Sequence, residues 1–264
     1  MSGIKSMKNK ELKELAEICI SKMDSSNRDF LYCKEPFQHV IIDNILPKEL
    51  ALSCLDSFPG SNDKSWENTS DEDIEIKKRS NWKSEFDIPD NILDTVRIFN
   101  SSLFLLKLSK IFNIPKLIPD PYFTGGGLNV TERGGLLDVH IDGNYHDASG
   151  LNRRLNVIFF LNYAWKSEWG GQFCLYDKEG NECKKKILPN FNRLLAFETS
   201  DISYHGLPEP LNCPEEVSRK SIILYYYTKQ ERPLKHNIHR KPHSALWKKR
   251  GLKDKKGNID REYS

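Results

Sequence analysis

The chain has 264 residues, of which 38% are hydrophobic and 29% are charged, with a formal net charge of +3. These values are typical of a globular protein with a sizeable buried core and exclude a low-complexity, disordered chain. The longest apolar runs, NVIFFL and SIILYYY, are far too short to cross a bilayer, so we expect no membrane partner.

The first 115 residues predict a mixed, largely helical support region with a long polar loop. A 3.6-residue period of apolar side chains predicts an amphipathic helix over 5–23. FQHVIIDNILP predicts a strand that runs into a turn, and residues 47–58 predict a second helix. The polar and charged stretch over 59–87 predicts a surface loop, and residues 91–112 predict a further helical stretch.

The character of the chain changes over residues 116–228. Short β-type segments follow one another, separated by Gly, Pro, Asn and Asp: GGLNVT, LLDVHID, RRLNVIFFLN, GGQFCLYD, RLLAFE and RKSIILYYYT. Such spacing is typical of a barrel or a double-sheet jelly roll. We therefore expect a mainly β fold, a double-stranded β-helix of the cupin-like type, with residues 1–115 as a helical buttress on one outer face.

Residues 229–264 form a basic tail. They contain 12 Lys and Arg against 4 Asp and Glu, a net charge of +8 that leaves −5 for the rest of the chain. Such a tail could contact nucleic acid or an acidic surface, but no aromatic side chains alternate with the basic ones in a stacking pattern. We favour a solvated extension with a helical turn and expect no nucleic-acid partner. We also expect the histidines of this tail to be solvated: His236, His239 and His243.

Two features predict a cytoplasmic location. The six cysteines are scattered without CxxC spacing, which argues for reduced thiols rather than a disulfide framework or a zinc site. The N-terminal segment MSGIKSMKNKELKEL lacks the apolar stretch of a signal peptide.

The segment LLDVHIDGNYHD, residues 136–147, carries the first candidate site. His140 and Asp142 face the same side of a strand, because alternate residues share a face. An imidazole and a carboxylate at this spacing are half of a facial metal site, and two histidines with one carboxylate suit non-haem Fe(II). His205, at the strand edge in AFETSDISYHGL, is the candidate third ligand. We expect His146 to be a loop histidine or a substrate contact, because a fourth protein ligand would close a coordination position that the reaction needs.

A second candidate site lies on the predicted strand RKSIILYYY. Arg219 and Ser221 share one face with alternate residues that follow, whereas Lys220 points the other way. An arginine that points into an apolar barrel is costly unless it meets an anion. A planar guanidinium binds a carboxylate through two hydrogen bonds. We therefore expect Arg219, rather than Lys220, to bind a carboxylate inside the barrel.

These segments together resemble a known enzyme family. The order His140-x-Asp142, then His205, then Arg219-x-Ser221 resembles the iron(II)/2-oxoglutarate-dependent oxygenases, in particular their prolyl-hydroxylase-like branch. NVTERGGLLDVHID resembles the strand and Gly-Gly turn that lead into the iron motif of those enzymes. RRLNVIFFLNYAWKSEWGGQFCLYD resembles their YLN…W…GG…L signature. The resemblance covers about residues 119–228, and PFQHVIIDNILP is also similar to such proteins.

The resemblance implies a set of site residues. It assigns three iron ligands: His140, Asp142 and His205. Arg219 would bind the distal carboxylate of 2-oxoglutarate, with Ser221 as a hydrogen-bonding neighbour. Thr131 occupies the position where many relatives carry a tyrosine that contacts the cosubstrate. Asn129, two residues earlier on the same face, is a candidate to take part in its place.

The implied reaction is a hydroxylation. Such a dioxygenase uses Fe(II), 2-oxoglutarate and O2, with ascorbate as a candidate reductant, and releases succinate and CO2 as it hydroxylates an aliphatic C–H bond. The related halogenases lack the carboxylate ligand, so Asp142 favours hydroxylation. The implied substrate is a residue of prolyl type in a protein or peptide, or a small metabolite. The acidic stretch over 71–75 and the basic tail are candidates to frame its entrance.

Two other functions fit the same segments. One is a catalytically inactive jelly-roll module that binds a sugar or a peptide, although the intact set of ligands argues against it. The other is a nucleic-acid demethylase that uses the same cofactors, which would need stacking aromatic side chains around a flipped base. The sequence does not indicate an oligomeric state.

Overall fold

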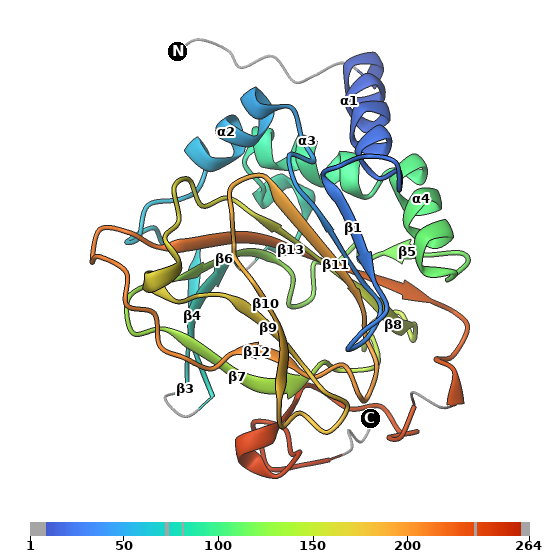
Figure 1. The fold of residues 1–264 in the computed structure, drawn as a ribbon, viewed down its shortest axis with the longest axis vertical. Helices are drawn as coiled ribbons and strands as arrows, with labels where there is room; N and C mark the ends of the chain where they lie inside the picture. Colours follow the sequence, from blue (N-terminus) through green and yellow to red (C-terminus); the bar gives the residue numbers. More distant parts are fainter. Residues whose placement is uncertain (1–8, 72–73, 81, 235–236, 260–264) are drawn as a thin grey trace.

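The computed structural model describes residues 9–71, 74–80, 82–234 and 237–259. In these residues one curved sheet of antiparallel strands dominates, and four α-helices lie against one of its faces (Figure 1). The mainly β fold with a helical buttress, predicted from the sequence, is confirmed. None of the helices in this part of the chain has the length and apolar character needed to span a membrane.

The buttress is built from the N-terminal part of the chain. It consists of α1 (Asn9–Lys22), α2 (Lys48–Asp56), α3 (Asp90–Phe99) and α4 (Ser102–Phe112). The helical stretch expected over 91–112 forms as two helices, because the chain breaks between α3 and α4. Ser101 starts the new helix, since its side chain accepts a hydrogen bond from the backbone N–H of Phe104. Residues 5–8 of the first expected helix lie outside the described residues.

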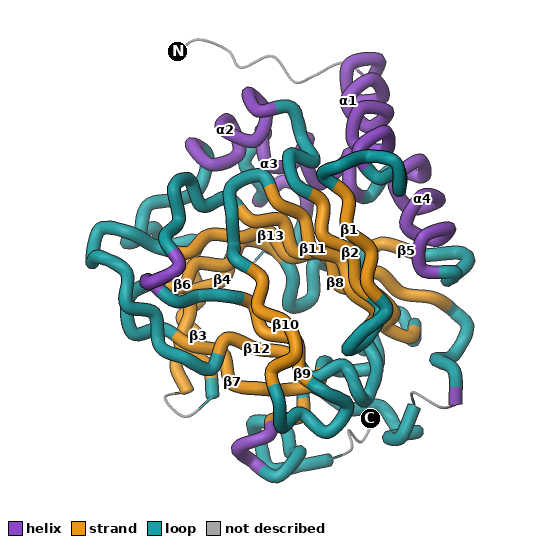
Figure 2. The backbone as a smooth tube through the Cα atoms, viewed as in Figure 1, coloured by secondary structure: helices purple, strands orange, loops and turns teal. Residues whose placement is uncertain are grey.

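The half of the sheet that the helices cover has six main strands in spatial order. They are β1 (Phe30–Cys33), β2 (His39–Ile42), β11 (Arg193–Glu198), β8 (Asn152–Phe160), β13 (Arg219–Thr228) and β6 (Gly127–Thr131). The short strand β5 (Ile118–Pro119) pairs with the end of β13. Figure 2 shows the helices gathered on the outer side of these strands.

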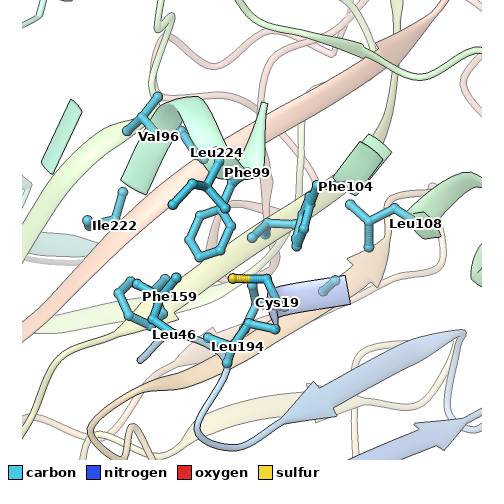
Figure 3. Packing of buried hydrophobic residues seen from close by; sticks show 14 of the residues in the cluster. Cys19, Leu46, Val96, Phe99, Phe104, Leu108, Phe159, Leu194, Ile222 and Leu224 are labelled. Atoms are coloured by element: carbon cyan, nitrogen blue, oxygen red, sulfur yellow. The ribbon is translucent and has the colours of Figure 1, made fainter. Parts of the chain in front are cut away.

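The core between helices and sheet is made by alternate residues of the central strands. Phe159 of β8, Leu194 of β11 and Leu224 of β13 point toward the helices, where they meet Cys19 of α1 and Phe99 of α3 (Figure 3). All five side chains are at most 4% exposed. Because strand side chains alternate between faces, the neighbours of these residues must point into the barrel.

The second half of the sheet faces the first across the barrel. Its strands are β4 (Glu75–Ser80), β7 (Leu136–Ile141), β12 (His205–Leu207), β9 (Phe173–Tyr176) and β10 (Cys183–Ile187), and β4 joins the two halves by pairing with β6. Phe160, Leu195 and Phe197 from the first half pack against Phe173 and Leu175 from the second. This apolar cluster fills only part of the interior, and polar side chains line the remainder.

The surface loop expected over 59–87 is wrong in its central part. Residues 66–80 contain a β-hairpin of β3 (Trp66–Asp71) and β4, with the ion pair of Glu67 and Arg79 across it. The reason is positional: β4 pairs with both β6 and β7, so a charged strand is held by backbone hydrogen bonds to its neighbours. This backbone pairing does not require apolar residues at alternate positions, so the charged sequence of β4 carries no strand signal.

The expectation of a solvated C-terminal tail is also wrong for several of its described residues, although others are exposed. Strand β14 (Leu246–Trp247) pairs with β7, and both of its residues are at most 3% exposed. The 3-10 turn η4 (Lys248–Arg250) follows it. The guanidinium of Arg232 lies 3.0 Å from the Asp201 carboxylate, and His243 lies 3.3 Å from the same carboxylate. His243 is therefore buried rather than solvated, whereas His236 lies outside the described residues.

Candidate metal centre and cosubstrate pocket

Strand pairing brings the three predicted ligands together. His140 lies near the end of β7, Asp142 follows that strand directly, and His205 begins β12, where it is paired opposite His140. The Nε2 atoms of His140 and His205 lie 3.7 and 3.4 Å from the Asp142 carboxylate oxygens. One ligand atom from each residue fits within 4.8 Å of the others, and all three side chains are buried. This is a facial arrangement of two imidazoles and one carboxylate.

Backbone carbonyls fix the tautomers of both histidines. Nδ1 of His140 lies 2.8 Å from the carbonyl oxygen of Asp138, and Nδ1 of His205 lies 2.8 Å from that of Ser203. A carbonyl only accepts, so each Nδ1 donates and each Nε2 keeps its lone pair for the shared point. Burial lowers the pKa of His205 to about 4, although Asp142 opposes the shift. This imidazole is therefore neutral near pH 7, as a metal ligand must be.

Asp142 is kept ionised by its neighbours. Burial alone would raise the pKa of Asp142, but the charge of the Arg153 guanidinium opposes this, and the pKa is held well below its ordinary value. Nη2 of Arg153 lies 3.8 Å from Oδ1 of Asp142. Nδ2 of Asn156 donates a hydrogen bond of 2.5 Å to Oδ2. A charged carboxylate and neutral imidazoles are the donor set that suits Fe(II).

Sequence reasoning missed both Arg153 and Asn156: simple alternation places Asn156 on the inward face with Ile158, but it places Arg153 on the opposite face of β8. In the structure Tyr227 pairs with Arg153 and Tyr225 with Asn156, and the register shifts between Tyr226 and Tyr227. The bulge leaves Arg154 as an extra residue, so both side chains point inward. A bulge of this kind depends on the pairing of two distant strands, and no local signal marked it.

A second polar group lies deeper in the barrel. On β13, Arg219 and Ser221 are paired opposite Thr131 and Asn129 of β6, so the four side chains share the inward face. Nε of Arg219 donates to the carbonyl oxygen of Gly171 at 2.9 Å. The half-buried side chain of Lys220 points to the other face, as expected, where its Nζ lies 2.9 Å from Oγ of Ser218.

The atoms of this group fit a carboxylate ligand. Within the described part of the chain, Nη2 of Arg219, Oγ of Ser221 and Oδ1 of Asn129 are buried and have no hydrogen-bond partner. Burial lowers the pKa of Arg219 to about 10, which reflects a buried cation without a carboxylate beside it. An anionic carboxylate would accept from both Arg219 and Ser221. Asn129 fits less well, because its unpartnered atom is itself an acceptor.

A cavity of about 1150 Å³ opens onto the triad. Its wall on β13 includes Tyr227, Tyr225 and Ile223, and Ser221 and Arg219 are the next two inward positions on that strand. A ligand that reached the triad from this cavity could therefore extend one end toward the guanidinium. The C-terminal segment borders the same cavity through residues between His243 and Asn258.

The two charged segments expected at the entrance meet each other at the cavity rim. Arg250 pairs with Asp71 at 2.7 Å, and Lys255 pairs with Glu75. Glu75 and Lys255 both border the cavity. These ion pairs attach the C-terminal segment to the β3–β4 hairpin across the opening.

His146 is not placed to bind a metal in this structure. Nε2 of His146 lies 3.0 Å from Oδ1 of Asp120, and its Nδ1 accepts a hydrogen bond from the backbone N–H of Ser149. Both ring nitrogens are thus in use, and His146 holds the loop that follows Asp142. The Trp247 ring packs against His140 with centroids 4.6 Å apart.

Comparison with known proteins agrees with the resemblance found in the sequence. Residues 126–227 match the 2OG-Fe(II) oxygenase superfamily, which confirms the resemblance seen in the sequence. A segment of 86 residues is 35% identical to the prolyl 3-hydroxylase OGFOD1 of Mus musculus. That segment is 31% of this chain, and it spans only 15% of the length of the mouse protein.

Solved structures share the fold. A Trichoplax adhaerens prolyl hydroxylase, in complex with a hypoxia inducible factor peptide fragment, aligns over 84% of this chain and 94% of its own, with a TM-score of 0.51 and 20% identity. A Pseudomonas putida prolyl-4-hydroxylase aligns over 83% of this chain and 100% of its own, with a TM-score of 0.50 and 14% identity. At such identities the likeness shows a common fold, and the predicted jelly roll is confirmed.

Proposed function

We propose, from the premise that residues 126–227 form a domain of the 2OG-Fe(II) oxygenase superfamily, that this protein is an Fe(II)- and 2-oxoglutarate-dependent hydroxylase. One observation carries the proposal. Two imidazoles and an ionised carboxylate converge on one point, and a buried guanidinium with an unpartnered Nη2 among the described residues lies inside the same barrel, on β13 of the facing half. A metal ion and a dicarboxylate would satisfy both groups at once.

In this proposal His140, Asp142 and His205 hold Fe(II), while Arg219 and Ser221 hold the distal carboxylate of 2-oxoglutarate. The loaded site supplies the chemistry that couples oxidative decarboxylation of 2-oxoglutarate, with release of succinate and CO2, to hydroxylation of a C–H bond. The chain contributes position and protection. His140, Asp142 and His205 would hold the metal with three protein ligands, which would leave room for the cosubstrate and O2, and residues of the C-terminal segment line the cavity beside them.

We propose a residue of prolyl type in a protein or peptide as the substrate, rather than a small metabolite. The named relatives that support this are a prolyl 3-hydroxylase and a prolyl hydroxylase bound to a peptide. The size of the cavity is consistent with part of a chain entering it, since about 1150 Å³ lies at or above the volume usual for small-molecule sites. A cytoplasmic setting is part of the proposal, and six free cysteines support it.

We also propose that three consecutive parts of the chain have different roles. Residues 116–228 would carry the chemistry, residues 1–115 would support the sheet, and residues 229–264 would close the cavity. The contacts of the tail with the iron motif, through β14 and Trp247, are the support for its role.

The first experiment is an anaerobic titration with Fe(II) and 2-oxoglutarate, followed by the visible metal-to-ligand charge-transfer absorption. We expect a band in the wild type and in His239→Ala, which removes a histidine outside the triad, and no band in His205→Ala. Absence of both the band and iron binding in the wild type would contradict the proposal and favour an inactive binding module.

The second experiment addresses the substrate. Succinate release would be measured, with and without ascorbate, for proline-containing peptides, free amino acids including proline, and methylated single-stranded nucleic acid, and peptide and amino-acid products would be checked for one added oxygen atom by mass spectrometry. We expect stimulation by peptides. Stimulation by free amino acids alone would favour a metabolite hydroxylase, and stimulation by methylated nucleic acid would favour the demethylase.

A further inference from the structure

Asp142 differs from the two histidines in how it is held. His140 and His205 lie within strands, and a backbone carbonyl fixes each ring. Asp142 comes one residue after the end of β7, so the sheet does not fix its backbone in the same way. Its side chain needs another restraint if the carboxylate is to meet the metal in one orientation.

The amide of Asn156 supplies that restraint. Its Nδ2 donates to Oδ2 of Asp142 at 2.5 Å, and its Oδ1 accepts from Nε of Arg153 at 3.1 Å. The two bonds agree on the orientation of the amide, because the guanidinium can only donate and the ionised carboxylate can only accept. A flipped amide would lose both.

Arg153 is itself fixed against the barrel wall. Its guanidinium carbon lies 3.4 Å from the centroid of the Tyr225 ring, a cation–π contact, and the side chain is 11% exposed. Nη2 of Arg153 is 3.8 Å from Oδ1 of Asp142, which is too long for a hydrogen bond. Arg153 therefore stabilises the negative charge of Asp142, whereas Asn156 makes the directional hydrogen bond to it.

We propose that Asn156, oriented by Arg153, is the positioning residue that holds Asp142 as a metal ligand. This inference rests on the proposed function, because it presupposes that the triad binds a metal. The β8 bulge makes this contact possible, because without the extra residue Arg153 and Asn156 would lie on opposite faces of the strand. Removal of such a contact to a ligand typically lowers metal affinity 10- to 100-fold.

Two variants of Asn156 test the contact. Asn156→Ala deletes the donor, and Asn156→Asp keeps the shape but presents an acceptor to another carboxylate. Asn156 borders the cavity, so truncation leaves space that is continuous with the cavity rather than a sealed hole. We expect both variants to stay folded and to bind Co(II), a spectroscopic substitute for Fe(II), at least tenfold more weakly than the wild type.

Asn162→Ala is the matched control. Asn162 is also a buried asparagine, two residues after the end of β8, and its Nδ2 donates to the carbonyl oxygens of Pro189 and Lys220. It contacts none of the triad residues through these bonds. We expect its Co(II) affinity to stay within twofold of the wild type, even if its stability falls.

The readout is Co(II) affinity from anaerobic absorption titrations of the full chain, together with the shape of the visible Co(II) bands, which report ligand geometry. Weakened affinity and altered bands in the two Asn156 variants alone would support the inference. Wild-type affinity in Asn156→Ala, or an equal loss in Asn162→Ala, would overturn it. Failure of the wild type itself to bind Co(II) and Fe(II) would instead overturn the proposed function and the inference with it.

Discussion

Replacement of Arg219 by methionine should change stability and cosubstrate binding in opposite directions. The pKa of Arg219 is lowered by burial from 12.5 to about 10, which corresponds to about 3 kcal/mol of unfavourable burial of the charge. Because the folded pKa lies below the unfolded one, this cost is present at every pH below about 10. Methionine removes the charge and also the hydrogen bond to Gly171, worth about 1 kcal/mol.

The expected result for the protein without ligands is therefore a gain of about 2 kcal/mol in the free energy of unfolding. The effect on 2-oxoglutarate has the other sign. Loss of two charge-assisted hydrogen bonds to a carboxylate costs about 3–4 kcal/mol, which is a 10²- to 10³-fold weaker affinity.

The assay compares urea denaturation of the metal-free protein with titration of 2-oxoglutarate into the metal-loaded protein. Lys220→Met is the control, because Lys220 lies on the same strand with its side chain on the other face. We expect the control to bind 2-oxoglutarate like the wild type. An Arg219→Met variant that is destabilised, or that binds 2-oxoglutarate within about threefold of the wild type, would refute the reasoning.

Three further predictions concern the segments that close the site. Trp247→Ala should lower the free energy of unfolding in urea by about 3 kcal/mol or more, because a side chain that is 3% exposed is deleted. Asp201→Asn should cost about 3–5 kcal/mol in the same assay, since it leaves the buried guanidinium of Arg232 without its counter-charge. Burial opposes ionisation of Glu75, but its neighbour Lys77 and a second lysine outweigh burial and lower its pKa from 4.5 to about 2. The resulting stabilisation, about 3 kcal/mol, should be fully present above pH 4.5 and lost as the pH falls toward 2, a pH dependence that Glu75→Gln should flatten.

Each of these predictions has a control. Glu182→Gln breaks an exposed ion pair with Lys184 and should change stability by less than about 0.5 kcal/mol. Trp66→Ala removes a half-buried tryptophan of the β3 strand and should cost less than Trp247→Ala. A loss below about 1 kcal/mol in Asp201→Asn would mean that the C-terminal segment is not anchored by this carboxylate.

Parts of the site could be predicted from the sequence because they depend on local geometry. Alternation along one strand is enough to place His140 and Asp142 on one side, and to send Arg219 inward and Lys220 outward. The burial cost of an arginine in a barrel also follows from the side chain alone. The order of the motifs then led to the resemblance, and residues 126–227 match the 2OG-Fe(II) oxygenase superfamily.

Other parts could not be predicted, because they depend on which distant strands lie side by side. The charged β3–β4 hairpin and the short strand β14 carry no apolar alternation of their own, and they form because β6 and β7 offer backbone partners. The inward position of Arg153 follows from a bulge set by the pairing of β8 with β13.

The sequence by itself determined the chemical types at the site: two imidazoles, a carboxylate and a guanidinium, at spacings that strand geometry converts into a common direction. Only the tertiary structure decided how those groups are held. The pairing of His205 opposite His140, the amide beside Asp142 and the tryptophan against His140 all come from contacts between segments far apart in the chain. The physical reason is that side-chain direction is a property of one strand, whereas register is a property of two.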